Sequence, residues 1–234
     1  MTISNDSRVR VKKIFEPIAL AMGRVGLTPD GLTIVGFGIT VAGAILLAMQ
    51  QWLIGGVVVF IGGVFDMFDG TLARATGQVS RLGAFMDSVF DRWGEVVVYI
   101  GIVAGLQAAG FAEGPLLAAA ALGMAVMVSY ARSKSEGLGF TEGTGMAAVG
   151  IMPREIRLVI LSLGLILAGI LGTTIDGPGG AGGASLPTGI LVLYVALGVI
   201  AIGATITVIQ RILHVRSQAK HQTTTTTTTT TPSE

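Results

Sequence analysis

The stretch that decides the fold runs from Asp66 to Asp91 and reads DMFDGTLARATGQVSRLGAFMDSVFD. Apolar runs at 52–65 and 96–103 flank it. It holds four carboxylates in these apolar surroundings: Asp66, Asp69, Asp87 and Asp91. An ionisable side chain on a membrane-length helix costs free energy, so such residues generally mark a functional site. Because hard oxygen ligands suit Mg²⁺, Ca²⁺ or Mn²⁺, four carboxylates in one helix-turn-helix predict a divalent-cation site.

The spacing of the four aspartates places each pair on one helix face. Asp66 and Asp69 are three residues apart, and Asp87 and Asp91 are four apart. Residues at these separations are neighbours on a helix surface, so two such helices packed together would aim all four at one cavity. Arg74 follows the first pair and carries a guanidinium that matches phosphate geometry. Carboxylates, a metal ion and an arginine together predict phosphoryl-transfer chemistry on a phosphate-bearing substrate.

Composition places the chain among integral membrane proteins. Of its 234 residues, 51% are hydrophobic and only 12% are charged, with a mean hydropathy of +0.76. Soluble domains carry about 25% charged residues. The net charge of +1 gives no reason to expect a nucleic-acid partner. Because the chain has no cysteine, disulfide and thiol chemistry are excluded.

Hydropathy predicts an all-α membrane protein with six transmembrane helices in one domain, residues 27–215. About 20 residues suffice to cross a ~30 Å hydrocarbon core. The predicted spans are 32–49, 52–73, 83–109, 115–135, 155–172 and 187–211.

The two ends of the chain lie outside this domain. In residues 1–26 the apolar stretch 14–22 is too short to span a bilayer. Its Ile14, Ile18 and Ala21 share one face, which predicts an amphipathic interfacial helix, with a floppy basic tail as the alternative. Residues 216–234 contain nine consecutive threonines and are predicted to form a disordered low-complexity tail.

The basic residues predict the orientation in the membrane. The turns near 50, near 112 and at 173–186 contain no lysine or arginine, whereas the opposite ends of the spans carry all of them. Positive charge is retained on the cytoplasmic side. Both termini and the aspartates are therefore expected at the cytoplasmic face of the cell membrane.

The charged motif resembles the signature of the CDP-alcohol phosphotransferases, with all eight defining positions filled. They are Asp66-x-x-Asp69-Gly70-x-x-Ala73-Arg74 and Gly83-x-x-x-Asp87-x-x-x-Asp91. The alternative, that these aspartates are helix-packing ion pairs or caps, is disfavoured because isolated carboxylates cost several kcal/mol in hydrocarbon.

The resemblance implies an enzyme that uses Mg²⁺ or Mn²⁺, with two ions, and CDP-diacylglycerol as lipid donor. Asp66, Asp69 and Asp87 would ligate metal, and Asp91 would share a second ion and act as general base. The site for the cytidine and diphosphate would be lined by Pro29, Asp30, Thr33, Gly70, Ala73, Arg74, Ser80 and Gly83.

A second group of charged residues predicts where an acceptor binds. Lys134, Arg154, Arg157 and Arg211 lie at the end of the spans that also carries the aspartates. They are either ordinary positive-inside charge or a pocket for a phosphorylated acceptor. Within the family, the stretches 130–136, 153–157 and 210–211 resemble the actinobacterial phosphatidylinositol phosphate synthases, which implies inositol 1-phosphate as acceptor. The order of charges at 153–157 departs from the commoner Arg-Pro-Glu-Arg, so either Arg154 or Arg157 would make the main contact.

Two other functions fit parts of the pattern. A phosphatidylglycerophosphate synthase would use glycerol 3-phosphate and also needs a pocket for an anion. A divalent-cation transporter explains buried carboxylates, but explains poorly an arginine beside them. Homodimers are common in the family, so the resemblance also implies a homodimer, for which the glycine-rich helices at 83–109 and 115–135 offer an interface.

Overall fold

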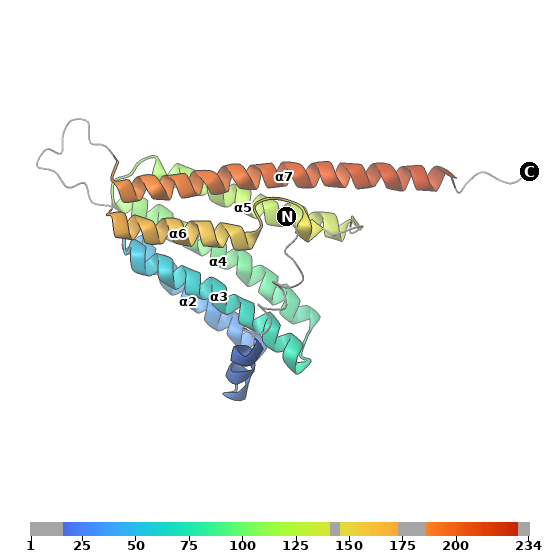
Figure 1. Cartoon of the computed structure of the whole chain (residues 1–234), viewed down its shortest axis with the longest axis horizontal. Coiled ribbons are helices and arrows are strands. Elements are labelled where there is room, and N and C mark those ends of the chain that lie inside the picture. Colours follow the sequence, from blue (N-terminus) through green and yellow to red (C-terminus); the bar gives the residue numbers. More distant parts are fainter. Residues whose placement is uncertain (1–15, 141–145, 173–185, 229–234) are drawn as a thin grey trace, which may run out of the picture.

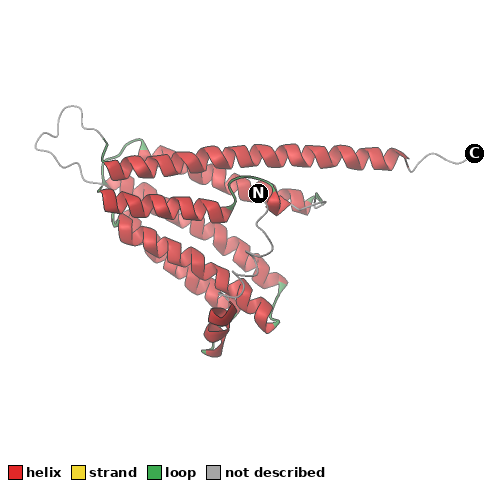
Figure 2. Cartoon of the chain, in the orientation of Figure 1, coloured by secondary structure: helices red, strands yellow, loops and turns green. Residues whose placement is uncertain are grey.

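The computed structural model describes residues 16–140, 146–172 and 186–228, and this part of the chain is all-helical, without a strand (Figures 1 and 2). The predicted all-α class is confirmed. The helices are α2 (Pro29–Ala48), α3 (Trp52–Thr76), α4 (Arg81–Ala108), α5 (Gly114–Gly137), the short 3₁₀ helix η1 (Met146–Ala148), α6 (Arg154–Leu171) and α7 (Thr188–Thr228).

Local sequence fixes the helix ends nearest the aspartates. The Thr28 hydroxyl accepts a hydrogen bond from the Gly31 N–H at 3.1 Å and caps α2, with a proline in its first turn. Helix α3 ends at Gly77 with a left-handed φ of 68°, a conformation that glycine adopts without strain. Ser80 then caps α4 by accepting from the Gly83 N–H at 2.9 Å. These signals make the α3–α4 turn short, so both aspartate pairs stay at one end of the bundle.

Helix α2 packs against both α3 and α4 and joins the two aspartate-bearing helices. Helices α6 and α7 complete the other side of the bundle, with α6 against α3 and α7 against α5 and α6 (Figure 1). Gly101 and Gly105 of α4 face the backbone carbonyls of Ala44 and Leu47 of α2. A Cβ at either glycine would clash with that backbone, so glycine permits the close approach of α2 and α4.

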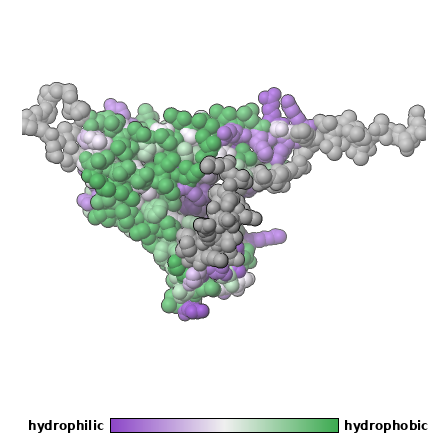
Figure 3. All heavy atoms as spheres, in the orientation of Figure 1, coloured by the Kyte–Doolittle hydropathy of each residue, from purple (hydrophilic) through white to green (hydrophobic). Residues whose placement is uncertain are grey.

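Within the described residues, four helices are long and apolar enough to cross a membrane: α2, α3, α5 and α7 as far as Lys220. Helices α4 and α6 also reach membrane-crossing length, but each carries three or more charged residues, among them Asp91, Arg92 and Glu95 in α4 and Arg154, Glu155 and Arg157 in α6. All six predicted spans coincide with helices, and their number as membrane crossings remains a prediction. On the face seen in Figure 3, apolar residues form most of the surface of the bundle, and most of the hydrophilic residues lie toward the end from which α7 projects.

The ends of the chain differ from the prediction in one respect. Residues 16–24 are helical, with Ala19 buried against Leu32, Phe68 and Leu72, whereas residues 1–15 of the predicted interfacial helix lie outside the described part. The predicted disorder from residue 216 is wrong as far as Thr228, because α7 continues to that residue. Extending an existing helix costs much less than nucleating one, so even threonine can prolong it.

Candidate active site

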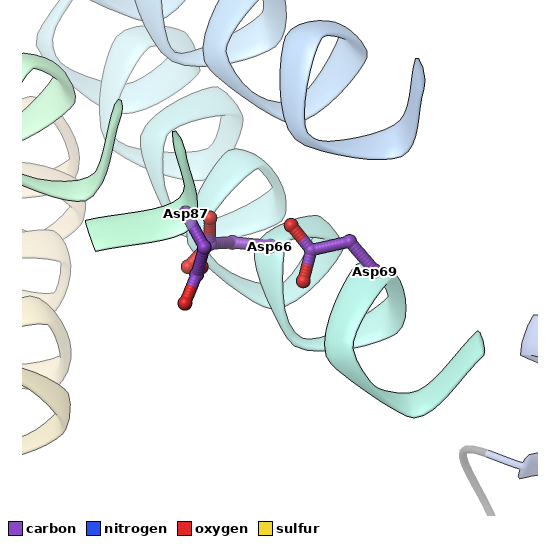
Figure 4. Close-up of side chains that lie close together, drawn as sticks. All are labelled: Asp66, Asp69 and Asp87. Carbon is purple, nitrogen blue, oxygen red and sulfur yellow. The ribbon is translucent and has the colours of Figure 1, made fainter. Parts of the chain in front are cut away.

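Three of the four aspartates converge between α3 and α4. Asp66 and Asp69 come from α3 and Asp87 from α4, and each offers an oxygen within 4.8 Å of the others (Figure 4). Three carboxylate oxygens this close repel one another unless a cation lies between them. Hard oxygen donors at this separation fit a divalent ion such as Mg²⁺ or Mn²⁺.

Asp69 is the most firmly held member of this triad of Asp66, Asp69 and Asp87. Its side chain is buried, with 5% of the residue exposed. The Thr33 hydroxyl of α2 donates to Asp69 Oδ2 at 2.5 Å, and the Gly70 backbone N–H donates to Asp69 Oδ1. Helix α2 therefore helps to set the direction of a carboxylate that belongs to α3.

Asp91 lies one turn beyond Asp87 and is joined to the triad by an arginine. Arg154 Nη1 of α6 lies 2.5 Å from Asp91 Oδ1 and 2.7 Å from Asp66 Oδ2. Arg92 adds a second contact to Asp91, at 3.0 Å. The sequence predicted that all four aspartates would share one cavity, and the structure gathers three and connects the fourth through Arg154.

An open pocket of about 240 Å³ adjoins the triad between α2, α3 and α4. We call it the outer pocket. It is lined by all eight residues predicted for the lipid donor: Pro29, Asp30, Thr33, Gly70, Ala73, Arg74, Ser80 and Gly83. Asp69 and Asp87 also line it, so ligand carboxylates face the space where a substrate would lie.

Two glycines of the outer pocket lie close to polar side chains. A Cβ at Gly70 would lie 3.2 Å from Arg74 Nη1, and one at Gly83 would lie 3.0 Å from Ser80 Oγ, the hydroxyl that caps α4. The bare backbone at Gly70 leaves the guanidinium room to meet a ligand. The sequence analysis missed Gln78, Val79 and Ala84, which also line the pocket and lie within the decisive stretch.

The structure separates the four cations predicted for the acceptor. Lys134 is exposed near the end of α5. The Arg154 side chain, 29% exposed, lies between Asp66 and Asp91. Arg211 is buried and donates to the backbone carbonyls of Val149, at 3.1 Å, and Val128.

Arg157 pairs with Glu95 rather than with one of the four aspartates. Its guanidinium binds both carboxylate oxygens of Glu95, at 2.9 and 3.0 Å, and the Met152 carbonyl at 3.1 Å. Glu95 was missed by the sequence analysis because it lies outside the motif. Its signal was a further acidic residue one turn after Asp91 in an apolar helix.

Comparison with known proteins agrees with this geometry. Residues 26–219 match the CDP-alcohol phosphatidyltransferase family. The chain is 33% identical over 214 residues to a phosphatidylinositol phosphate synthase of Mycobacteroides abscessus, which covers 90% of this chain and 87% of the relative. It is 35% identical over 154 residues to an archaetidylinositol phosphate synthase of Pyrococcus horikoshii, with 66% and 77% covered.

Solved structures show the same fold. The phosphatidylinositol phosphate synthase of Mycobacterium tuberculosis with CDP-DAG bound superposes with a TM-score of 0.70 at 31% identity, covering 87% of this chain and 94% of that one. The same enzyme in complex with manganese and citrate gives 0.69 at 30% identity, covering 86% and 88%. With this match spanning the transmembrane domain and its aspartates, the chain belongs to the CDP-alcohol phosphatidyltransferase family, a family of membrane enzymes.

Proposed function

We propose that the protein transfers the phosphatidyl group of CDP-diacylglycerol to a hydroxyl of inositol 1-phosphate, giving phosphatidylinositol phosphate and CMP. The observation that carries the proposal is the meeting of the aspartate triad with the outer pocket, whose lining contains every residue expected for the lipid donor. The relatives named above are synthases of inositol phosphate lipids, and one was solved with CDP-DAG bound.

The outer pocket would receive the cytidine and diphosphate of the lipid donor while the acyl chains remain in the bilayer. Arg74 lies beside Gly70, where a guanidinium can form two parallel hydrogen bonds to a phosphate. The Thr33 hydroxyl donates to Asp69, and the Ser80 hydroxyl accepts from the Gly83 N–H at the start of α4. Both residues would therefore mainly shape the wall of the pocket.

Asp66, Asp69 and Asp87 would hold the metal, Mg²⁺ or Mn²⁺, and Asp91 would share a second ion. Bound metal would neutralise the negative charge of the diphosphate and of the departing CMP. The convergence of three hard oxygens within 4.8 Å fits such an ion. The hydrogen bond from Thr33 orients the Asp69 carboxylate toward such an ion, as hydrogen bonds to metal ligands commonly do.

Asp91 is the proposed general base. It would accept the proton of the acceptor hydroxyl while that oxygen forms a bond to the β-phosphorus and the bond from phosphorus to the CMP oxygen breaks. Arg154 and Arg92 contact opposite oxygens of Asp91 and orient it.

The acceptor's phosphate would be held by Arg154, with Lys134 and Arg211 contributing. Arg154 combines partial exposure with contact to two of the aspartates, whereas Arg157 is closed off by Glu95. These contacts favour Arg154 over Arg157 as the main contact of the acceptor's phosphate. A phosphomonoester carries nearly two negative charges at pH 7, so it needs such a cation near four carboxylates.

The test is transfer by the purified protein in detergent, with CDP-diacylglycerol and a panel of acceptors. We expect divalent metal to be required, and inositol 1-phosphate to be used in preference to inositol, glycerol 3-phosphate or serine. Thin-layer analysis of the lipid and release of CMP report product and leaving group separately. Preference for glycerol 3-phosphate would instead identify a phosphatidylglycerophosphate synthase, and preference for free inositol would refute the anion-binding role of Arg154.

We also propose that the site and both termini face the cytoplasm and that the enzyme is a homodimer. The basic residues at the aspartate end of the bundle support the orientation. Because the chain has no cysteine, single cysteines placed at exposed positions can report sidedness with a membrane-impermeant reagent. Mass measurement in detergent would test the dimer.

A further inference from the structure

Two ion pairs connect α4 to α6, one helical turn apart. Arg154 contacts Asp91 at 2.5 Å, and one turn farther along both helices Arg157 contacts Glu95 at 2.9 Å. Asp91 and Glu95 are four residues apart on α4, and Arg154 and Arg157 are three apart on α6, so each pair shares a helix face. Arg154, Arg157 and Glu95 line an inner cavity between α2, α3, α4 and α6, which Asp66 also lines.

The two arginines differ in what they can reach. The Arg154 side chain is 29% exposed, whereas that of Arg157 is 2% exposed. The guanidinium of Arg157 donates hydrogen bonds to Glu95 and to the Met152 carbonyl. A substrate phosphate can approach Arg154 but would have to break three hydrogen bonds to reach Arg157. Arg157 therefore acts on the site through other residues.

The segment that enters α6 is held on both sides at Met152. Its N–H donates to the Thr207 hydroxyl of α7 at 3.0 Å, and its carbonyl accepts from Arg157. Pro153 follows and caps α6, and Arg154 is the first residue of that helix. The Glu95–Arg157 pair thus fixes α6 against α4 within one turn of the guanidinium that contacts the aspartates.

We propose that Glu95 and Arg157 are positioning residues. They hold α6 so that the Arg154 guanidinium contacts Asp66 and Asp91 and can also bind the acceptor's phosphate. This role rests on the proposed function for its acceptor. A buried ion pair is weak evidence for a contribution to stability, since apolar replacements are often as stable. Its bidentate geometry does restrict how α6 can slide or rotate relative to α4.

The main test replaces both Glu95 and Arg157. Glu95→Gln alone would leave the buried guanidinium of Arg157 without a counter-charge, which can prevent folding. The double variant Glu95→Gln, Arg157→Gln removes both charges and keeps similar side-chain volume. We expect it to raise the KM for inositol 1-phosphate about tenfold, as for loss of one oriented charged contact, with the KM for CDP-diacylglycerol within about twofold. Equal rises in both KM values, or no rise in either, would refute positioning through Arg154.

Coupling to Arg154 provides a sharper result. In an Arg154→Gln background, the same double change should raise the acceptor KM by less than about twofold, because the residue that it positions is already gone. Fully additive effects would show that the pair acts independently of Arg154 and would overturn the proposal. Glu136→Gln is the matched control, since Glu136 also binds an arginine, Arg132, but at the exposed end of α5.

A measurement without turnover separates this proposal from the proposed function. The chain lacks cysteine, so spin labels can be attached at Val89→Cys of α4 and Val159→Cys of α6, both exposed positions. We expect the double Gln variant to broaden or shift the distance distribution between the labels, and Glu136→Gln to leave it unchanged. An unchanged distribution in the double variant would refute positioning, whichever acceptor the enzyme uses.

Discussion

The Thr33 hydroxyl donates a 2.5 Å hydrogen bond to Asp69 Oδ2, so α2 orients a carboxylate carried by α3. The other oxygen of Asp69 accepts from the Gly70 N–H, which leaves the carboxylate little freedom to rotate. A ligand fixed before the metal binds loses less conformational entropy on binding. Thr33 thus links the packing of α2 against α3 to the affinity of the site for metal.

We expect Thr33→Val to weaken metal binding while the protein still folds. The substitution keeps the shape of the side chain and removes the hydroxyl that orients Asp69. Loss of such an outer hydrogen bond typically costs about 10- to 100-fold in metal affinity. Titration of Mn²⁺ by electron paramagnetic resonance measures this without turnover.

Thr205→Val is the matched control, because the Thr205 hydroxyl donates only to the Ala201 carbonyl of its own helix. It should leave Mn²⁺ affinity unchanged. If Thr33→Val bound Mn²⁺ as tightly as the wild type, the hydrogen bond to Asp69 would have no role in preparing the site.

Asp66→Ala, Asp69→Ala and Asp87→Ala should each abolish turnover without preventing membrane insertion. Each removes one oxygen from a group in which all three lie within 4.8 Å. CMP release at saturating Mg²⁺ measures the activity, and gel filtration in detergent checks that each variant is folded. Activity near the wild-type level in any of the three would contradict the proposed metal site.

Asp91→Asn should lose turnover yet still bind the CDP-containing lipid. The amide keeps the shape of the carboxylate, but it cannot take a proton from the acceptor hydroxyl. Binding of CDP-diacylglycerol, measured by protection against thermal unfolding, distinguishes this role from metal ligation. If Asp91→Asn lost binding as fully as Asp69→Asn, Asp91 would be mainly a ligand.

The helices and the aspartate triad were predictable because their signals are local. Proline, glycine and capping residues mark the helix ends, and the fixed spacing of Asp66, Asp69 and Asp87 places them on facing surfaces. The eight residues that the family resemblance assigns to the lipid donor all line the outer pocket, and their role in binding the donor stays a prediction.

The roles of the arginines were not predictable in the same way. Arg154 contacts Asp66 across 88 residues of sequence, and Arg157 pairs with Glu95 across 62. Positive charge at the ends of spans is expected on any cytoplasmic face. Which carboxylate each arginine meets depends on the rotation of α6 against α3 and α4, and this follows from packing rather than from local sequence.

Gly101→Ala should destabilise the bundle because its Cβ would clash with the Ala44 carbonyl oxygen of α2. Backbone cannot yield as a flexible side chain can, so we expect a loss of about 1–3 kcal/mol. Gly123→Ala on α5 is the matched control, since nothing lies within 4 Å of its added Cβ. Unfolding in mixed micelles by added SDS compares the two. Equal stability would mean that α2 and α4 need no close approach at this position.

Arg154→Gln should raise the KM for inositol 1-phosphate much more than the KM for CDP-diacylglycerol. Arg154 is the partly exposed cation that contacts Asp66 and Asp91, so it can neutralise an incoming phosphate where the carboxylates would repel it. Loss of one charge-assisted contact costs about 1.5–3 kcal/mol, which is roughly a ten- to hundredfold loss of affinity. Initial rates with each substrate varied in turn give both KM values.

Three further variants separate the acceptor site from general positive charge. Lys134→Gln should raise the acceptor KM more weakly, because a flexible ammonium makes less directional contacts than a guanidinium. Arg211→Gln should raise it through loss of the contacts to Val149 and Val128 as well as of charge. Arg132→Gln, which removes an exposed charge paired with Glu136, is the control and should change neither KM. If Arg154→Gln behaved like Arg132→Gln, the arginines here would serve only membrane orientation, and the acceptor's phosphate would have to be bound elsewhere.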